Sequence, residues 1–147
     1  MSRLAKIVLV TLTLAAAAFV VSFWFISRPA SRTPVPPPDM NGDWVPANIG
    51  DDPYYQVATI RDGTIEVYWR LGSDDDLELY WAGTFGEPTT EKEPYVWESV
   101  NDLEKAKTSR RASRDEKKTF IYKKGELIYN VNVSHLKLSV SLVKKDG

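Results

Sequence analysis

The chain opens with one long run of apolar residues and continues with shorter stretches in which apolar and polar residues alternate. The long run covers residues 7–26, IVLVTLTLAAAAFVVSFWFI, and contains no charge. At a helical rise of about 1.5 Å per residue, a helix of this length crosses the roughly 30 Å hydrocarbon core of a bilayer. The pattern therefore predicts one N-terminal transmembrane helix and a single-pass membrane protein.

Basic residues flank this run on both sides. Arg3 and Lys6 precede it, and Arg28 and Arg32 follow it. Because the two sides are balanced, only the α-amino group favours a cytoplasmic tail of residues 1–6, with the rest of the chain outside the cell. A cleaved signal peptide and a secreted protein are the alternative, but the end of the run before Arg28 shows no A-x-A-like cleavage site.

A proline-rich segment follows the predicted anchor. Residues 27–40, SRPASRTPVPPPDM, contain five prolines and almost no large apolar groups. Such chains adopt extended polyproline conformations and act as semi-rigid spacers. We therefore expect this segment to hold residues 41–147, which are enough for one ordinary domain, away from the membrane surface.

From residue 41 onward, apolar and polar residues alternate with the period of two that is typical of strands with one buried face. In the last run, Leu136, Leu138, Val140 and Leu142 share one face, whereas Lys137 lies on the other. The pattern predicts seven strands, with a short eighth around Trp44 as an option: Tyr54–Arg61, Thr64–Leu71, a run from Leu77, Tyr95–Val100, Lys117–Lys124, Glu126–Val133 and a run from Leu136.

Short links that contain glycine separate these strands, for example Asp62-Gly63 and Lys124-Gly125. Such links favour hairpins, and consecutive hairpins make an antiparallel meander. We therefore expect an all-β domain of seven to eight strands in a closed or nearly closed barrel, because closure removes exposed sheet edges. A β-sandwich is the alternative. Residues 101–111 interrupt the alternation and predict a helical turn or a charged loop.

Charge is segregated along the domain. Residues 43–104 hold fifteen acidic and three basic residues, a net of −12, whereas residues 105–147 hold twelve basic and four acidic residues, a net of +8. The two halves should attract each other, so complementary packing is the first interpretation.

Cysteine is absent from the sequence, which excludes disulfides, thiolate metal sites and a cysteine-linked lipid.

Basic residues are densest between residues 105 and 118. An exposed basic cluster outside the cell could bind anionic lipid, an anionic envelope polymer or an acidic surface protein. Nucleic acid is not expected as a partner outside the cytoplasm. The alternative is that these residues neutralise the acidic strands. The candidate residues of this anion-binding patch are Lys105, Lys107, Arg110, Arg111, Arg114, Lys117 and Lys118.

Residues suited to catalysis or metal binding are sparse. His135 is the one histidine, and it precedes the last strand with no nucleophile-elbow pattern nearby. Asp74, Asp75 and Asp76 lack the alternating spacing of a calcium loop, so a solvated hairpin turn explains them better. We therefore expect no enzymatic activity, no cofactor and no metal site.

Several aromatic side chains could stack on sugars if they point outward. Aromatic residues in a small domain usually fill the core, and we expect that role for most of them. The candidates are Tyr54, Tyr55, Tyr68, Tyr80 and Trp97.

Gly42-Asp43-Trp44, at the start of the predicted meander, resembles the Gly-x-Trp motif of lipocalins and the similar opening of avidin-like barrels. The tryptophan closes one end of those barrels. The resemblance implies a lipocalin-like barrel in which Gly42 and Trp44 close one end. It supports the barrel shape more than ligand transport, because lipocalins are longer and usually contain cysteines.

A wider resemblance covers nearly all of residues 40–147. The series MNGDW, DGTIEVYW, LYWAGTF, PYVWESVND and FIYKKGELIY is similar to a group of small uncharacterised extracytoplasmic β-domain proteins of Gram-positive bacteria and their phages. The resemblance implies a bacterial or phage-encoded surface protein. Members are often tethered by lipid, and here the transmembrane segment would replace the missing lipid-bearing cysteine.

Two functions follow from these patterns, and both place an extracytoplasmic domain at the cell membrane. The first is a membrane-anchored binding or interference module displayed at the surface. In a phage or prophage, such a module would suit superinfection exclusion, in which it blocks an incoming phage. The alternative is a non-catalytic β-barrel that binds a small ligand in a cavity lined by Trp69 and Trp81, or an envelope polymer in a shallow aromatic groove.

Overall fold

The computed structural model describes residues 36–145, except 49, 51–52, 73–75 and 134. The expected transmembrane segment, residues 7–26, and most of the expected spacer lie outside the described residues. Within the described part of the chain, no helix is long and apolar enough to cross a membrane.

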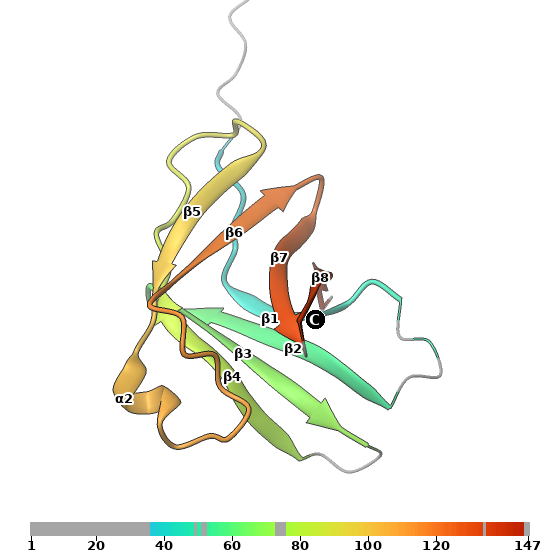
Figure 1. Ribbon diagram of the computed structural model, residues 1–147. Helices are drawn as coiled ribbons and strands as arrows, with labels where there is room; N and C mark the ends of the chain where they lie inside the picture. The colour runs from blue at the N-terminus through green and yellow to red at the C-terminus, as the bar shows by residue number, and fades with distance from the viewer. Residues whose placement is uncertain (1–35, 49, 51–52, 73–75, 134, 146–147) are drawn as a thin grey trace, which may run out of the picture. The chain divides into compact units, whose positions relative to one another are not determined.

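The described residues form eight β-strands and one helical turn (Figure 1). Of the two options for residues 101–111, the structure has the helical turn, and the optional strand around Trp44 is also present. The elements are β1 Gly42–Pro46, β2 Tyr54–Arg61, β3 Thr64–Leu71, β4 Leu77–Thr84, β5 Tyr95–Val100, α2 Leu103–Ala106, β6 Lys117–Lys123, β7 Glu126–Val133 and β8 Leu136–Lys144.

All eight strands belong to one antiparallel sheet in the order β4-β3-β2-β1-β8-β7-β6-β5. Strands that follow one another in the chain are therefore paired, except β4 and β5, which stand at the two ends of the sheet. Strand β1 joins the first strands to the last by pairing with both β2 and β8. A single bridge between Gly83 and Asn101 connects the end of β4 to the end of β5. The all-β meander is thus confirmed as a nearly closed, barrel-like sheet, in contrast to the two packed sheets of a sandwich.

Two hairpin turns explain why the neighbouring strands fold back so tightly. Asp62 and Gly63 have φ values of 49° and 72°, and Lys124 and Gly125 have φ values of 54° and 84°. Two successive residues with positive φ form the tight turn that matches the natural twist of paired strands. Glycine adopts this conformation without the steric cost of a Cβ atom, so the sequence of each turn sets the register of its hairpin.

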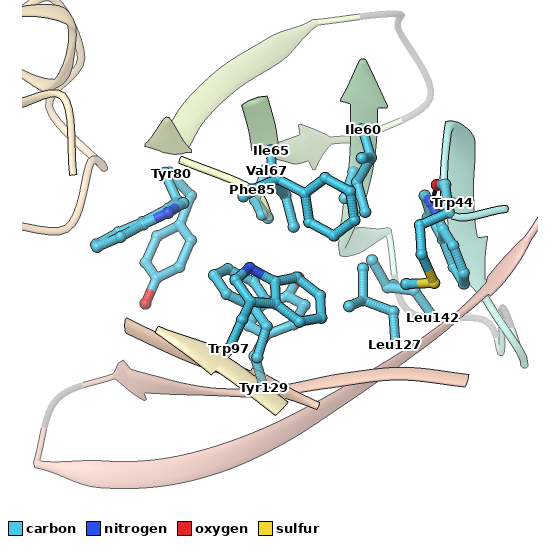
Figure 2. Packing of buried hydrophobic residues seen from close by; sticks show 14 of the residues in the cluster. Trp44, Ile60, Ile65, Val67, Tyr80, Phe85, Trp97, Leu127, Tyr129 and Leu142 are labelled. Carbon is cyan, nitrogen blue, oxygen red and sulfur yellow. Dashed lines mark hydrogen bonds between the residues drawn. The ribbon is translucent and has the colours of Figure 1, made fainter. Parts of the chain in front are cut away.

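Aromatic and aliphatic side chains together fill the space enclosed by the sheet (Figure 2). Trp97 stacks on Phe120 with 5.3 Å between ring centroids. Trp81 is fully buried, and its indole nitrogen donates a hydrogen bond to Ser99 Oγ at 3.0 Å. A Cβ atom added to Gly83 would lie 2.6 Å from that indole nitrogen. The space between Gly83 and Trp81 is therefore too tightly packed to accept a single methyl group.

The expected alternation is wrong over two stretches, and the sheet explains both. In β4, Leu79, Tyr80 and Trp81 are all buried, whereas Leu77 is 52% exposed. The register between β3 and β4 shifts here, so Tyr80 is an extra residue in a β-bulge, which turns consecutive side chains inward.

The second departure lies in β8. Leu142 is fully buried, but Leu136 and Leu138 are 64% and 47% exposed. The short strand β1 ends at Pro46, which pairs with Leu142. The first half of β8 therefore has a strand on its β7 side only, and its leucines receive less cover than a strand in mid-sheet provides.

Candidate functional site

The segment between β5 and β6, residues 101–116, runs along the outer edge of β4 and carries most of the predicted basic patch (Figure 1). The amide of Asp102 donates to the carbonyl of Ala82 at 2.7 Å, and the amide of Ser113 donates to that of Tyr80 at 2.8 Å. An uncovered strand edge invites pairing with other chains. The segment therefore covers the free edge of β4 and protects it from pairing with other chains.

Ion pairs join the basic second half of the domain to its acidic first half, as complementary packing predicts. The pairs are Lys105 with Glu66, Arg111 with Glu78 at 2.8 Å, and Lys117 with Glu98 at 2.7 Å. Lys107 pairs with Glu104 of the same helical turn. Arg114 donates to the carbonyl of Ser109 at 3.4 Å.

Two residues of the predicted patch differ from the others. The side chain of Arg110 makes no ion pair or hydrogen bond with the described residues, and it borders a surface hollow. Lys118 is only 8% exposed and lies in the wall of the barrel. Its Nζ atom is 5.2 Å from the ring centroids of both Tyr80 and Trp81. The structure therefore does not gather all seven candidate residues on one open basic surface.

The Gly-x-Trp residues begin the first strand. Trp44 is 1% exposed, and its indole nitrogen donates to the carbonyl of Met40 at 3.1 Å. Its ring meets Tyr122 edge to face, with 6.2 Å between centroids. Gly42 has a φ of 138°, and a Cβ atom there would lie 2.9 Å from Cε of Lys144. Both features suit a close approach of the incoming chain to the end of β8.

Polar side chains alternate with buried ones along β3, so they lie on its outer face. Ile65 and Val67 are fully buried, whereas Thr64, Glu66 and Tyr68 are partly exposed. Three surface hollows follow this face, with volumes of about 190, 420 and 470 Å³. We call this row of hollows the outer track. The hollows share lining residues, since the first two both contact Glu66 and the last two both contact Lys105.

The residues that line the outer track come from β2, β3, β4, the end of β5 and the segment of residues 101–116. The smallest hollow is lined by Thr59, Arg61, Thr64 and Glu66. The 420 Å³ hollow is lined by Thr64, Glu66, Ala82, Gly83, Thr84, Val100, Asn101, Asp102 and Lys105. The 470 Å³ hollow is lined by Tyr68, Leu77, Glu78, Leu79, Lys105, Thr108, Ser109 and Arg110.

A hydrogen-bonded group stands between the two larger hollows. The carboxylate of Glu66 accepts hydrogen bonds from the Lys105 ammonium group and from the Tyr68 hydroxyl. Burial raises the pKa of Glu66, but these two hydrogen bonds outweigh burial and lower the pKa below its usual value. Burial and the hydrogen bond to Glu66 raise the pKa of Tyr68 to about 12. Glu66 therefore stays ionised and Tyr68 stays neutral across the physiological pH range, and the hydrogen bonds hold all three side chains in place.

Sequence reasoning did not identify Glu66 as a site residue. Its place on the outer face of a strand is visible from the alternation, but its partner Lys105 is 39 positions away. No periodic pattern links two such positions.

The aromatic residues considered for sugar stacking differ in where they lie. Tyr80 and Trp97 are buried in the core, whereas Tyr68 lines the outer track.

The described residues offer no metal centre, since no three His, Cys, Asp or Glu side chains among them gather closely enough to hold an ion. His135 is exposed and has a φ of 73° just before β8.

Comparison with protein-family models, with curated proteins and with solved structures finds no match for this chain.

Proposed function

We propose that this protein is a non-catalytic binding module displayed at the outer surface of a cell membrane. Residues 7–26 anchor it, residues 27–40 act as a spacer, and the β domain meets the partner. We further propose a lipocalin-like barrel. Two observations support that fold: the strands follow chain order around the sheet, and Trp44 is buried at the start of the first strand.

The observation that carries the proposal is the outer track. Its two larger hollows have about 420 and 470 Å³ each, within the range of about 300 to 1,000 Å³ that is usual for ligand sites. They lie on β3, a strand paired on both sides along its length, and they meet at Lys105. A rigid face with adjoining hollows suits recognition of an elongated partner.

The resemblance to surface proteins of Gram-positive bacteria and their phages suggests a setting for such a module. Encoded by a phage or prophage, it would act in superinfection exclusion by occupying a surface component that an incoming phage needs. The partner would be a surface protein or an envelope polymer.

Expression of the full-length gene alone, in a host that a broad panel of phages infects, tests this proposal. We expect plating of one or more phages to fall. A variant without residues 7–26 should restore plating, because the domain would leave the surface. A Tyr68→Ala and Arg110→Ala double variant tests the outer track, with Tyr54→Ala as the control outside it. Unchanged plating of the whole panel on the full-length protein would contradict the proposal.

A barrel that binds a small ligand between Trp69 and Trp81 is less well supported. Trp81 is fully buried, and the space beside Gly83 has no room for a methyl group. The outer track favours the other form of the alternative function, which is recognition of an envelope polymer.

A further inference from the structure

We infer that the outer track binds a neutral, hydroxyl-rich polymer, namely a glycan strand, and that Tyr68 is the platform for one of its sugar rings. The inference rests on the proposed function, because it names the kind of partner that the same face would recognise. It departs from the sequence-based expectation of an anionic partner for the basic segment.

Charge balance within the outer track is the first argument. Three basic residues and three acidic residues line its hollows, and they are Arg61, Lys105, Arg110, Glu66, Glu78 and Asp102. Two of the basic groups already have partners, since Arg61 is 2.9 Å from Asp43 and Lys105 is bonded to Glu66. Opposite charges at such distances largely cancel beyond about 10 Å at moderate salt. A polyanion would therefore gain little attraction from this face.

Hydrogen-bonding groups are the second argument. The lining includes the hydroxyl groups of Thr59, Thr64, Thr84, Thr108 and Ser109. The Thr64 hydroxyl makes no hydrogen bond with the described residues. The others are partly used, because those of Thr59, Thr108 and buried Ser109 donate to Asp43 and to the carbonyls of Lys105 and Leu79, and that of Thr84 accepts from the amide of Val100. A hydroxyl group both donates and accepts, so a row of them complements a ligand that is itself rich in hydroxyl groups.

Tyr68 provides the third argument. Tyr68 lines the 470 Å³ hollow together with Leu77 and Leu79, and its hydroxyl group is bonded to Glu66. An aromatic face that is held in position offers an apolar platform for the C–H face of a sugar ring, with little further loss of side-chain freedom on binding.

A peptide fits this surface less well than a glycan. Along Thr64–Arg70, β3 pairs with both β2 and β4, so its backbone groups are already used in the sheet. Extended peptides commonly bind by adding a strand to a free edge. The outer track has no such edge on β3, and a ligand must bind there through side chains.

The test is a calorimetric titration of the full-length chain in detergent with neutral linear tetrasaccharides of N-acetylglucosamine, glucose and mannose. We expect saturable binding of one or more of them. Tyr68→Ala should weaken that binding at least about ten-fold, because it removes the platform. Tyr54→Ala, which removes a 58% exposed tyrosine outside the track, should leave it unchanged. The affinity should change less than about two-fold between roughly 50 and 500 mM salt, since no net charge is neutralised.

Thr64→Val serves as a second variant, because it removes a lining hydroxyl group with almost no change in side-chain volume and should also weaken binding. Absence of saturation with all three tetrasaccharides would overturn the inference. Equal losses from Tyr68→Ala and Tyr54→Ala, or preferred binding of polyphosphate with steep salt dependence, would do the same. Reduced phage plating without sugar binding would leave the proposed function standing with a protein partner and reject the glycan.

Discussion

Lys118 shows how one residue in the barrel wall differs from the surface lysines around it. Its ammonium group donates to the carbonyl of Asn130 at 3.2 Å and lies 3.6 Å from the carboxylate of Asp115. The rings of Tyr80 and Trp81 face it from β4. Burial lowers the pKa of Lys118, and the neighbouring Asp115 offsets that effect only in part. The charged form therefore reduces the stability of the fold compared with a neutral side chain.

Lys118→Met should leave the protein equally stable or more stable, by up to about 1 kcal/mol at pH 7, because the charge is removed while the volume is kept. The carboxylate of Asp115 is half exposed, so water solvates it once the Lys118 ammonium group is removed. In the wild-type protein, the pKa of Lys118 is lower in the folded state than its usual value of 10.5, which holds in the unfolded chain. Between these two values the unfolded chain binds more protons, so the free energy of unfolding rises as pH rises through that window. The variant should lack this gain.

Urea unfolding of both proteins at pH 7 and near pH 10 measures the effect on the free energy of unfolding. The difference between the two proteins should shrink at the higher pH. A variant that is less stable than the wild type by more than about 2 kcal/mol at pH 7 would show that the interactions of Lys118 outweigh its burial.

At the scale of the elements, the sequence predicted the strands well because its alternation and its glycine turns act locally. The boundaries of β2, β3, β5 and β7 agree with the predicted ranges. The predictions that failed concern which side chains are buried, and burial depends on residues that are neighbours in space. The bulge at Tyr80 is a shift of register between β3 and β4, and the exposure of Leu136 follows from the short length of β1. Alternation within one strand reveals neither.

The two ends of β8 give a direct test of this explanation. Leu142→Ala should cost about 2 to 5 kcal/mol, because it leaves a cavity in the core. Leu136→Ala should cost less than about 0.5 kcal/mol, because most of that side chain is already in contact with solvent. Guanidinium denaturation of the two variants provides the comparison. Similar losses for both would show that Leu136 is covered in the folded protein.

At the scale of the whole molecule, charge segregation predicted that the two halves of the domain pair, but it did not locate the outer track. Lys118 was grouped with the basic patch because it lies near the other lysines in sequence. Its alternation with Phe120 already places it on the inner face of β6. The group of Glu66, Tyr68 and Lys105 forms only when β3 and the segment of residues 101–116 come together. The proposed function adds residues 7–26 as an anchor that displays this face.

The most direct test of a displayed binding module is protease treatment of intact cells that carry the full-length chain with a C-terminal tag, combined with membrane fractionation. We expect the chain in the membrane fraction and the tagged domain to be digested from outside, while a cytoplasmic control protein stays intact. Protection of the domain until the cells are lysed would place it in the cytoplasm and contradict the account.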